Sequence, residues 1–409
     1  SLHRHKVTCQ SDKSIFNSTA SNRRACLAAL SGSGLSFFSR TVCRSFSAEP
    51  KPANALNTTN GSEVLVESLR VNSAYPAVGF SEGHLQVLGQ QVPISYWYPA
   101  VQSQGLTVPA YRQRTSFGKI VSKFLRVPVS PRIFNVDNLI LASDFVLTDA
   151  QPMPRTLPVV ILAHGYLGSR FDLVHLAERL AVQGFIVASP EFGDSRSGEI
   201  SPPGFLGHEA GRMDILQAAV SAVTTNFATG PLGLVGHSAG SGTIFSLVGS
   251  YPRVSIAGLV PSSSRQLQGP TLVVASSGDS TARFQGGIAS MLKRLPDDFS
   301  RIVPEENGTS CMRLPKMAAL FLEKPNHISF LSERSNSALM RTLGFLLPIA
   351  RLLRLGVLDF DKYYATRDSV ETAAAVLPIV EGFLFQELCE DAREHCQGGC
   401  EGVKHGLTT

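Results

Sequence analysis

Two kinds of segment alternate along the middle of this chain. Unbroken apolar runs of four to seven residues predict parallel strands that are buried on both faces; they lie at 157–163, 185–190, 230–236, 254–260 and 271–276. Between these runs, apolar residues recur at helical spacing in segments 171–184, 208–227 and from 240 onward. The alternation predicts an α/β fold built on a mostly parallel, doubly wound sheet.

The segments that flank this alternating region have a different character. Residues 92–100, VPISYWYPA, predict an earlier strand because they are β-branched and aromatic. Residues 101–150 form a long connection with a short helix expected at 117–125, and a connection of this length predicts a lid or a substrate wall. Extra helices are expected over 335–388, followed by a cysteine-containing tail at 389–409.

Within the C-terminal region, residues 337–358 are apolar apart from three arginines. One interpretation is a lid or interfacial helix that makes peripheral contact with a membrane surface. The alternative is a buried helical hairpin that is broken at Pro348. Either arrangement would wall an apolar acyl pocket.

Charge is distributed unevenly along the 409 residues. Eight of the 37 Lys and Arg residues lie in residues 1–56, with only two of the 32 acidic residues. This composition predicts a targeting leader or a disordered tail ahead of one large domain at 57–388. A twin arginine, a broken apolar stretch and an Ala-Asn-Ala triplet favour a plastid address, in the stroma or the thylakoid lumen, with a mitochondrial presequence as the alternative. The remainder is close to neutral, which argues against nucleic acid as a partner.

Three of the seven cysteines, Cys389, Cys396 and Cys400, cluster near the end of the chain. Their spacing lacks the close Cys-x-x-Cys pairs of a zinc site, so we expect free thiols or a disulfide and no metal.

The stretch GLVGHSAGSGT at 233–243 places Ser238 between a predicted buried strand and a predicted helix. A nucleophile elbow requires this context, because the turn lifts the serine hydroxyl out of the sheet. Gly236 and Gly240 would face each other across the turn, where a Cβ atom would clash. The alternative is a strand–turn–helix joint that uses glycine only for packing.

A nucleophilic serine needs a base and an orienting acid, in the chain order Ser, Asp or Glu, His. Asp279 directly follows the predicted strand 271–276, at the sheet edge where such sites lie, whereas no strand precedes the weaker candidates Asp297 and Asp298. His327 is the one histidine between Ser238 and His395. A helix-capping aspartate and a surface-loop histidine are the competing interpretations of Asp279 and His327.

Two backbone donors are needed for the oxyanion of an acyl-transfer reaction. The expected donors are the amide of Ala239, directly after the nucleophile, and the amide of Tyr166, in the loop that follows strand 157–163. His164 and His237 are expected to be buried for structural reasons.

From about 92 to 330, the chain resembles the α/β-hydrolase superfamily, in the branch of platelet-activating-factor acetylhydrolase and dienelactone-hydrolase-like serine esterases. The resemblance rests on SYWYPA, LPVVILAHGYLGSR, LAVQGFIVASPEFGD and GHSAGSGT and on their spacing. It implies the roles of nucleophile for Ser238, acid for Asp279, base for His327 and oxyanion donors for Tyr166 and Ala239. The acetylhydrolases place their acid closer to the nucleophile, and the last ~80 residues match no part of the family.

The predicted activity is therefore hydrolysis of a small carboxylic ester, with a lipid-like ester preferred and no cofactor. The chain is also similar to chlorophyllases through HGYLG and its leader, although Ala239 stands where that family has arginine. Two further interpretations are a non-catalytic ligand-binding relative and an acyltransferase that uses the same three residues.

Overall fold

The computed structural model describes residues 77–101, 110–125, 129–130, 134–200, 209–258, 260–261, 267–279, 295, 299–302, 314–343 and 369–389. In these residues, the five apolar runs form the strands β6 (Leu157–Ala163), β7 (Ile186–Pro190), β8 (Thr229–His237), β9 (Arg253–Ile256) and β10 (Thr271–Ser276). Most of their side chains are buried, and the exposed positions lie at the start of β8. The prediction of central strands covered on both faces is confirmed.

One sheet contains ten of the described strands, in the order β11-β12-β10-β9-β8-β6-β7-β2-β1-β5. The additional members are β1 (Ala77–Val87), β2 (Gln90–Ala100), β5 (Val146–Thr148), β11 (Ser300–Ile302) and β12 (Met317–Leu322). The strand β2 is antiparallel to both β1 and β7, and the other pairings of this sheet are parallel. The mostly parallel sheet predicted from the sequence is therefore observed.

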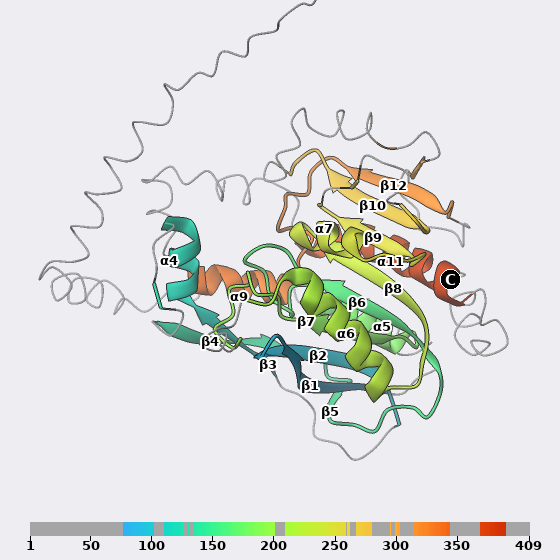
Figure 1. Cartoon of the computed structure of the whole chain (residues 1–409). Coiled ribbons are helices and arrows are strands. Elements are labelled where there is room, and N and C mark those ends of the chain that lie inside the picture. Colours follow the sequence, from blue (N-terminus) through green and yellow to red (C-terminus); the bar gives the residue numbers. More distant parts are fainter. Residues whose placement is uncertain are drawn as a thin grey trace, which may run out of the picture. The chain divides into compact units, whose positions relative to one another are not determined.

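Helices cover both faces of this sheet (Figure 1). On one face, α5 (Val174–Val182) and α11 (Ser369–Cys389) pack on the strands, and α9 (Glu333–Leu343) contacts α11. On the other face lie α6 (Arg212–Asn226) and α7 (Ala239–Ser246). Each layer encloses its own cluster of buried apolar side chains, so the sheet is doubly wound as expected.

Residues 101–150 contain more structure than the predicted helix. That helix is present as α4 (Phe117–Leu125). It lies between β3 (Ala110–Ser116) and β4 (Asn135–Leu141), which form a separate two-stranded antiparallel sheet. The inward side chains of β3 are Tyr111, Gln113 and Thr115, so this strand carries no apolar alternation that the sequence could show.

The strand β1 was also not predicted. It is joined to β2 by a tight turn in which Leu88 and Gly89 both have positive φ, of 49° and 77°. Its middle carries the polar residues Ser81, Glu82 and His84, which obscure the apolar pattern. Pairing along the full length of β2 supplies the backbone hydrogen bonds that compensate for this weak pattern.

The last described helix, α11, is part of the hydrophobic core. It is the one helix among the described residues that is long and apolar enough to cross a membrane, yet 56% of its most apolar window is buried inside the protein. Leu384 and Leu388 pack against Gly233 of β8, where a methyl group would lie 2.8 Å from Leu388. The helix ends at the buried Cys389, whereas Cys396 and Cys400 lie outside the described residues, as do residues 1–56 and most of 337–358.

Candidate active site

Ser238 lies in a strained turn between β8 and α7. Its backbone has φ 55° and ψ −119°, a combination that L-residues rarely adopt. The N–H of Ser238 donates to the carbonyl of Ile256 on β9 at 2.9 Å, and the N–H of Ser241 donates to the carbonyl of Ser238 at 3.0 Å. The turn is therefore held from both sides, which is the arrangement expected of a nucleophile elbow.

The elbow glycines occupy the positions where the backbone is most crowded. A methyl group on Gly236 would lie 2.5 Å from the carbonyl carbon of Gly240, and one on Gly240 would overlap the carbonyl oxygen of Ala163. The two residues thus face each other as the sequence predicted. Gly240 also brings the start of α7 against the end of β6.

The side chains of Ser238, His327 and Asp279 form one hydrogen-bonded chain. The His327 Nε2 atom lies 2.8 Å from Ser238 Oγ, and the His327 Nδ1 atom lies 2.7 Å from Asp279 Oδ2. The carboxylate of Asp279 is 2% exposed, and the side chain of His327 is 16% exposed. A buried acid, a nearly covered imidazole and a serine hydroxyl are therefore aligned within hydrogen-bond reach.

Neighbouring parallel strands bring these residues together. Asp279 follows β10, and His327 follows β12, which pairs with β10 in parallel so that their carboxyl ends meet. Gly278 makes the close approach possible, because a methyl group there would lie 2.6 Å from the carbonyl oxygen of Lys324. The weaker acid candidates Asp297 and Asp298, and the histidine His395, lie outside the described residues.

Tyr166 lies in the loop after β6 and Ala239 is the first residue of α7, and these two segments meet at the elbow. A methyl group at Gly165 would lie 3.0 Å from Cβ of Ser238, so the loop after β6 packs directly on the serine. The side chain of Tyr166 is 46% exposed, and Ala239 is exposed at the start of α7. Ala239 follows Ser238 in the sequence, and Tyr166 belongs to the loop that packs on Ser238. Both residues therefore lie where oxyanion donors would be needed.

The two buried histidines of this region hold different parts of the site. His164 donates from Nδ1 to the carbonyl of Gly165 at 2.8 Å, because its Nε2 accepts the N–H of Phe192 at 2.9 Å. Burial lowers the pKa of His164. His237 lies with its Nε2 3.1 Å from the carbonyl oxygen of His327, a contact that the sequence did not reveal.

A compact turn carries His327. The Asn326 side-chain oxygen accepts the N–H groups of Ile328 and Ser329, at 3.1 and 2.9 Å, and the Ser329 hydroxyl at 2.8 Å. Asparagine favours such turns because its short side chain bonds to the backbone two residues later. The sequence NHIS at 326–329 contains this signal, which could have identified Asn326 as a supporting residue.

The segment after this turn is bound to the loop after β6. The N–H of Ser332 donates to the carbonyl of Asp172 at 2.9 Å, and the Ser335 hydroxyl donates to the carbonyl of Phe171 at 2.5 Å. Asp172 in turn forms a buried ion pair with Arg196 at 2.7 Å. The segment that follows β6 and the segment that follows the His327 turn are therefore joined by hydrogen bonds.

Arg170 is a second buried charge, and its ion pairs fix the loop between β6 and α5. Its guanidinium contacts carboxylates of Glu191 at 3.0 Å, Glu199 at 2.6 Å and Glu82 at 3.0 Å. Burial by itself lowers the pKa of Arg170, but the three carboxylates together outweigh burial and raise the pKa above its ordinary value. The sequence pattern did not single out Arg170. Its place between two buried elements was a signal, because a buried arginine requires partners of opposite charge.

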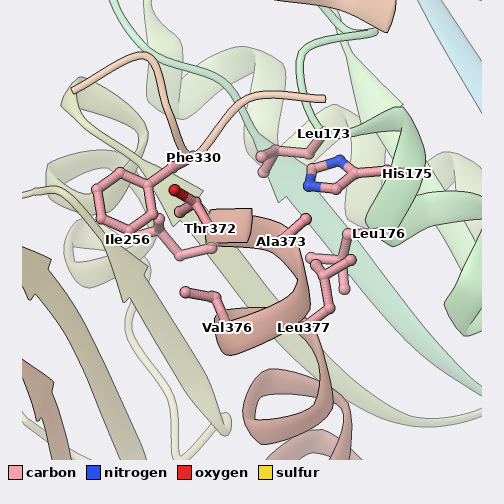
Figure 2. Close-up of a pocket in the computed structure, with 9 residues that line it drawn as sticks. All are labelled: Leu173, His175, Leu176, Ile256, Phe330, Thr372, Ala373, Val376 and Leu377. Atoms are coloured by element: carbon pink, nitrogen blue, oxygen red, sulfur yellow. The ribbon is translucent and has the colours of Figure 1, made fainter. Parts of the chain in front are cut away.

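A small apolar cavity lies beneath the loop of His327 (Figure 2). Phe330 from this loop and Ile256 from β9 border it, and α5 and α11 supply the other lining side chains, His175 among them. Its volume of ≈ 10 Å³ admits no more than about one water molecule. The cavity is thus a packing gap in the interior and cannot accommodate an acyl chain.

No group of three or more His, Cys, Asp or Glu side chains that could hold a metal ion exists among the described residues.

Comparisons with known proteins find a partial likeness to a curated enzyme. No family model matches the chain. It is similar to the bis(hydroxyethyl) terephthalate hydrolase of Streptomyces coelicolor, with 29% identity over 161 residues that cover 38% of this chain and 50% of that enzyme. The chain thus spans half the length of this curated relative.

Structural comparison matches the chain with two solved structures among others. One is a ferulic acid esterase from Streptomyces cinnamoneus, with TM-score 0.47, 16% identity and coverage of 76% of this chain and 90% of that chain. The other, described as a dienelactone hydrolase from Klebsiella pneumoniae, has TM-score 0.35, 14% identity and coverage of 66% and 98%. The strand order with antiparallel β2 and the elbow after β8 form the α/β-hydrolase type of fold that the sequence resembles.

Proposed function

We propose that this chain, which has an α/β-hydrolase type of fold, is a serine hydrolase that cleaves carboxylic esters through an acyl-enzyme. The observation that carries the proposal is the hydrogen-bonded chain from Asp279 through His327 to Ser238. A serine hydroxyl becomes a nucleophile when a neighbouring base accepts its proton and a third group orients that base. The resemblance to a bacterial ester hydrolase supports the same reaction class.

The reaction follows from these contacts. The Ser238 Oγ attacks the ester carbonyl carbon while its proton moves to His327 Nε2, and Asp279 stabilises the imidazolium. The amides of Tyr166 and Ala239 are the proposed donors to the oxyanion. His327 then gives the proton to the leaving alcohol, whose C–O bond breaks. Water attacks the acyl-enzyme, loses its proton to His327, and the proton returns to Ser238 as the acid leaves.

For the substrate, we propose an ester with an apolar acyl group, in the lipid-like class. The apolar character of 337–358, of which only 337–343 is described, supports this choice. The competing class is a compact aromatic ester, suggested by the name of the Streptomyces coelicolor relative. The acyl groups of these two classes differ in length, so the rates of hydrolysis across one series of substrates distinguish the two classes.

The test is hydrolysis of p-nitrophenyl esters from acetate to palmitate, and of bis(hydroxyethyl) terephthalate, by the full chain. Ser238→Ala is the inactive variant, and Ser246→Ala, on the exposed side of α7, is its matched control. We expect ester cleavage by the parent and by Ser246→Ala, and none above background by Ser238→Ala. A folded parent that cleaves no ester and is not labelled at Ser238 by a fluorophosphonate would overturn the proposal.

A preference for long acyl chains would support the lipid-like class, and a preference for acetate and the terephthalate ester would contradict it. The reaction is also run with an added alcohol. Formation of a new ester in excess of free acid would show an acyltransferase, which contradicts hydrolysis as the main reaction.

A further inference from the structure

His237 lies at the junction of the proposed nucleophile and the proposed base. It is the last residue of β8 and directly precedes Ser238. Its side chain is 3% exposed, and its Nε2 lies 3.1 Å from the backbone carbonyl oxygen of His327. The two imidazole rings lie 4.8 Å apart between centroids, at an interplanar angle of 43°.

The contact with His327 fixes the tautomer of His237. A carbonyl oxygen only accepts hydrogen bonds, so Nε2 of His237 carries the proton and Nδ1 holds a lone pair. That Nδ1 atom is buried and has no hydrogen-bond partner among the described residues. Burial, and secondly the charge of His327, lower the pKa of His237 to about 4, so the ring is neutral at physiological pH.

An apolar side chain would fill the same space without a buried nitrogen that lacks a partner. Such a nitrogen is unfavourable in the interior, because it has lost its hydrogen bonds to water. What the histidine adds over phenylalanine at this position is therefore the Nε2–H bond to His327. This bond joins the backbone of the base to the residue beside the nucleophile.

We infer that His237 is a positioning residue, which fixes the His327 backbone so that the imidazole of His327 stays within hydrogen-bond reach of Ser238. The inference rests on the proposed function of the three-residue chain. The ring of His327 is already bonded to Asp279 and Ser238, and the bond from His237 adds a third point, on the main chain. Reaction rates respond steeply to such geometry, because a misplacement of about 1 Å can reduce the rate about 100-fold.

The loop after β6 is coupled to the same residue. A methyl group at Gly165 would lie 3.2 Å from Nδ1 of His237 and 3.0 Å from Cβ of Ser238. His237 therefore contacts the loop that bears Tyr166 on one side and the turn that bears His327 on the other. We therefore expect a change at His237 to affect both loops.

The test compares two substitutions in the full chain. His237→Gln retains an N–H donor at the reach of Nε2, whereas His237→Phe fills the volume and removes the donor. For each variant, kcat and KM are measured on the best ester of the parent, the rate of fluorophosphonate labelling at Ser238 is followed, and the melting temperature is recorded. The low-field proton NMR signal of the His327–Asp279 hydrogen bond supplies a readout that needs no turnover.

We expect His237→Phe to lower kcat and the labelling rate about 100-fold, with KM within about threefold and the fold intact. We expect His237→Gln to recover most of that loss, and the NMR signal to broaden in the Phe variant only. Equal kcat in the Phe and Gln variants would overturn the inference, as would losses that follow melting temperature alone. A parent without activity or labelling would contradict the proposed function instead, and the NMR signal would still test the positioning role.

Discussion

Arg179 of α5 and Glu381 of α11 form a buried ion pair between residues 202 positions apart in the chain. The guanidinium bonds to both carboxylate oxygens, one of them through Nη2 at 2.8 Å, and the side chain of Gln183 adds a third bond at 2.8 Å. Each side chain of the pair is 6% exposed. The pair connects α5 and α11, the two helices that pack on the same face of the sheet.

Removal of one charge should destabilise the fold, because it leaves the other charge buried without compensation. We expect Glu381→Gln to lower the free energy of unfolding by about 3–5 kcal/mol. The matched control is Asp137→Asn in the exposed pair with Arg114, where the side chains are 47% and 42% exposed and the expected loss is below about 1 kcal/mol. Urea unfolding at pH 7 measures both, and equal losses would contradict the role of the buried pair.

Asp279→Asn should reduce kcat strongly while the fold is retained. The amide would still contact His327 Nδ1, but it would not stabilise the imidazolium or hold the tautomer that presents Nε2 to Ser238, and we expect kcat to fall about 10⁴-fold. Steady-state kinetics on the best p-nitrophenyl ester measures this. The control is Asp214→Asn at the exposed start of α6, which should leave kcat unchanged.

Two glycines of α7 should respond in opposite ways to the same added methyl group. In Gly240→Ala the methyl group would overlap the carbonyl of Ala163, so we expect a loss of at least about 1–3 kcal/mol in stability together with loss of esterase activity. In Gly242→Ala the methyl group meets nothing within 4 Å, and stability should rise by about 0.5–1 kcal/mol. Thermal unfolding and activity of the two variants provide the comparison.

Stability should fall on acidification because of the buried histidines. Burial lowers the pKa of His164, and it lowers that of His237 to about 4. Below the ordinary histidine pKa of about 6.5, the unfolded chain therefore binds more protons at both residues than the native chain does. Their contribution to stability is complete above about pH 6.5 and decreases as the pH falls, and that of His237 decreases until the pH reaches about 4.

Urea unfolding at pH 7.5, 6 and 4.5 measures this effect. Many groups titrate over this range, so His237→Gln is the informative variant. It should show a smaller decrease in unfolding free energy between pH 7.5 and 4.5 than the parent. An equal decrease in unfolding free energy in both proteins would show that the native state does not prevent the protonation of His237.

The sequence predicted the central elements because burial on both faces leaves a strong pattern. The run at 157–163 coincides with β6 residue for residue, and the strands β7, β8 and β10 agree within two residues. The strand β3 was not predicted, because its inward side chains are polar and form hydrogen bonds with specific partners. For example, the Tyr111 hydroxyl donates to Glu178 at 2.7 Å. Such partners are distant in sequence, so a local sequence pattern cannot predict them.

The candidate catalytic residues were proposed from the sequence for a similar reason. Ser238 directly follows β8, Asp279 lies just beyond β10, and the elbow constrains its flanking glycines, so local sequence carries the information on which the proposal rests. The supporting contacts were not predictable, because they depend on how loops pack after folding. His237 was expected to be a packing residue, and its bond to the carbonyl of His327 joins residues 90 positions apart.

Because the proposed nucleophile and base are 89 positions apart, the order of synthesis separates them in time. At about 5–20 residues per second, a ribosome adds His327 roughly 4–18 s after Ser238. The native contacts of β8 with α11, through Leu384 and Leu388, require about 60 further residues. We therefore expect the serine of a nascent chain to stay unreactive at least until His327 has emerged, and fluorophosphonate labelling of ribosome-bound chains of increasing length would show whether the packing of α11 is needed as well.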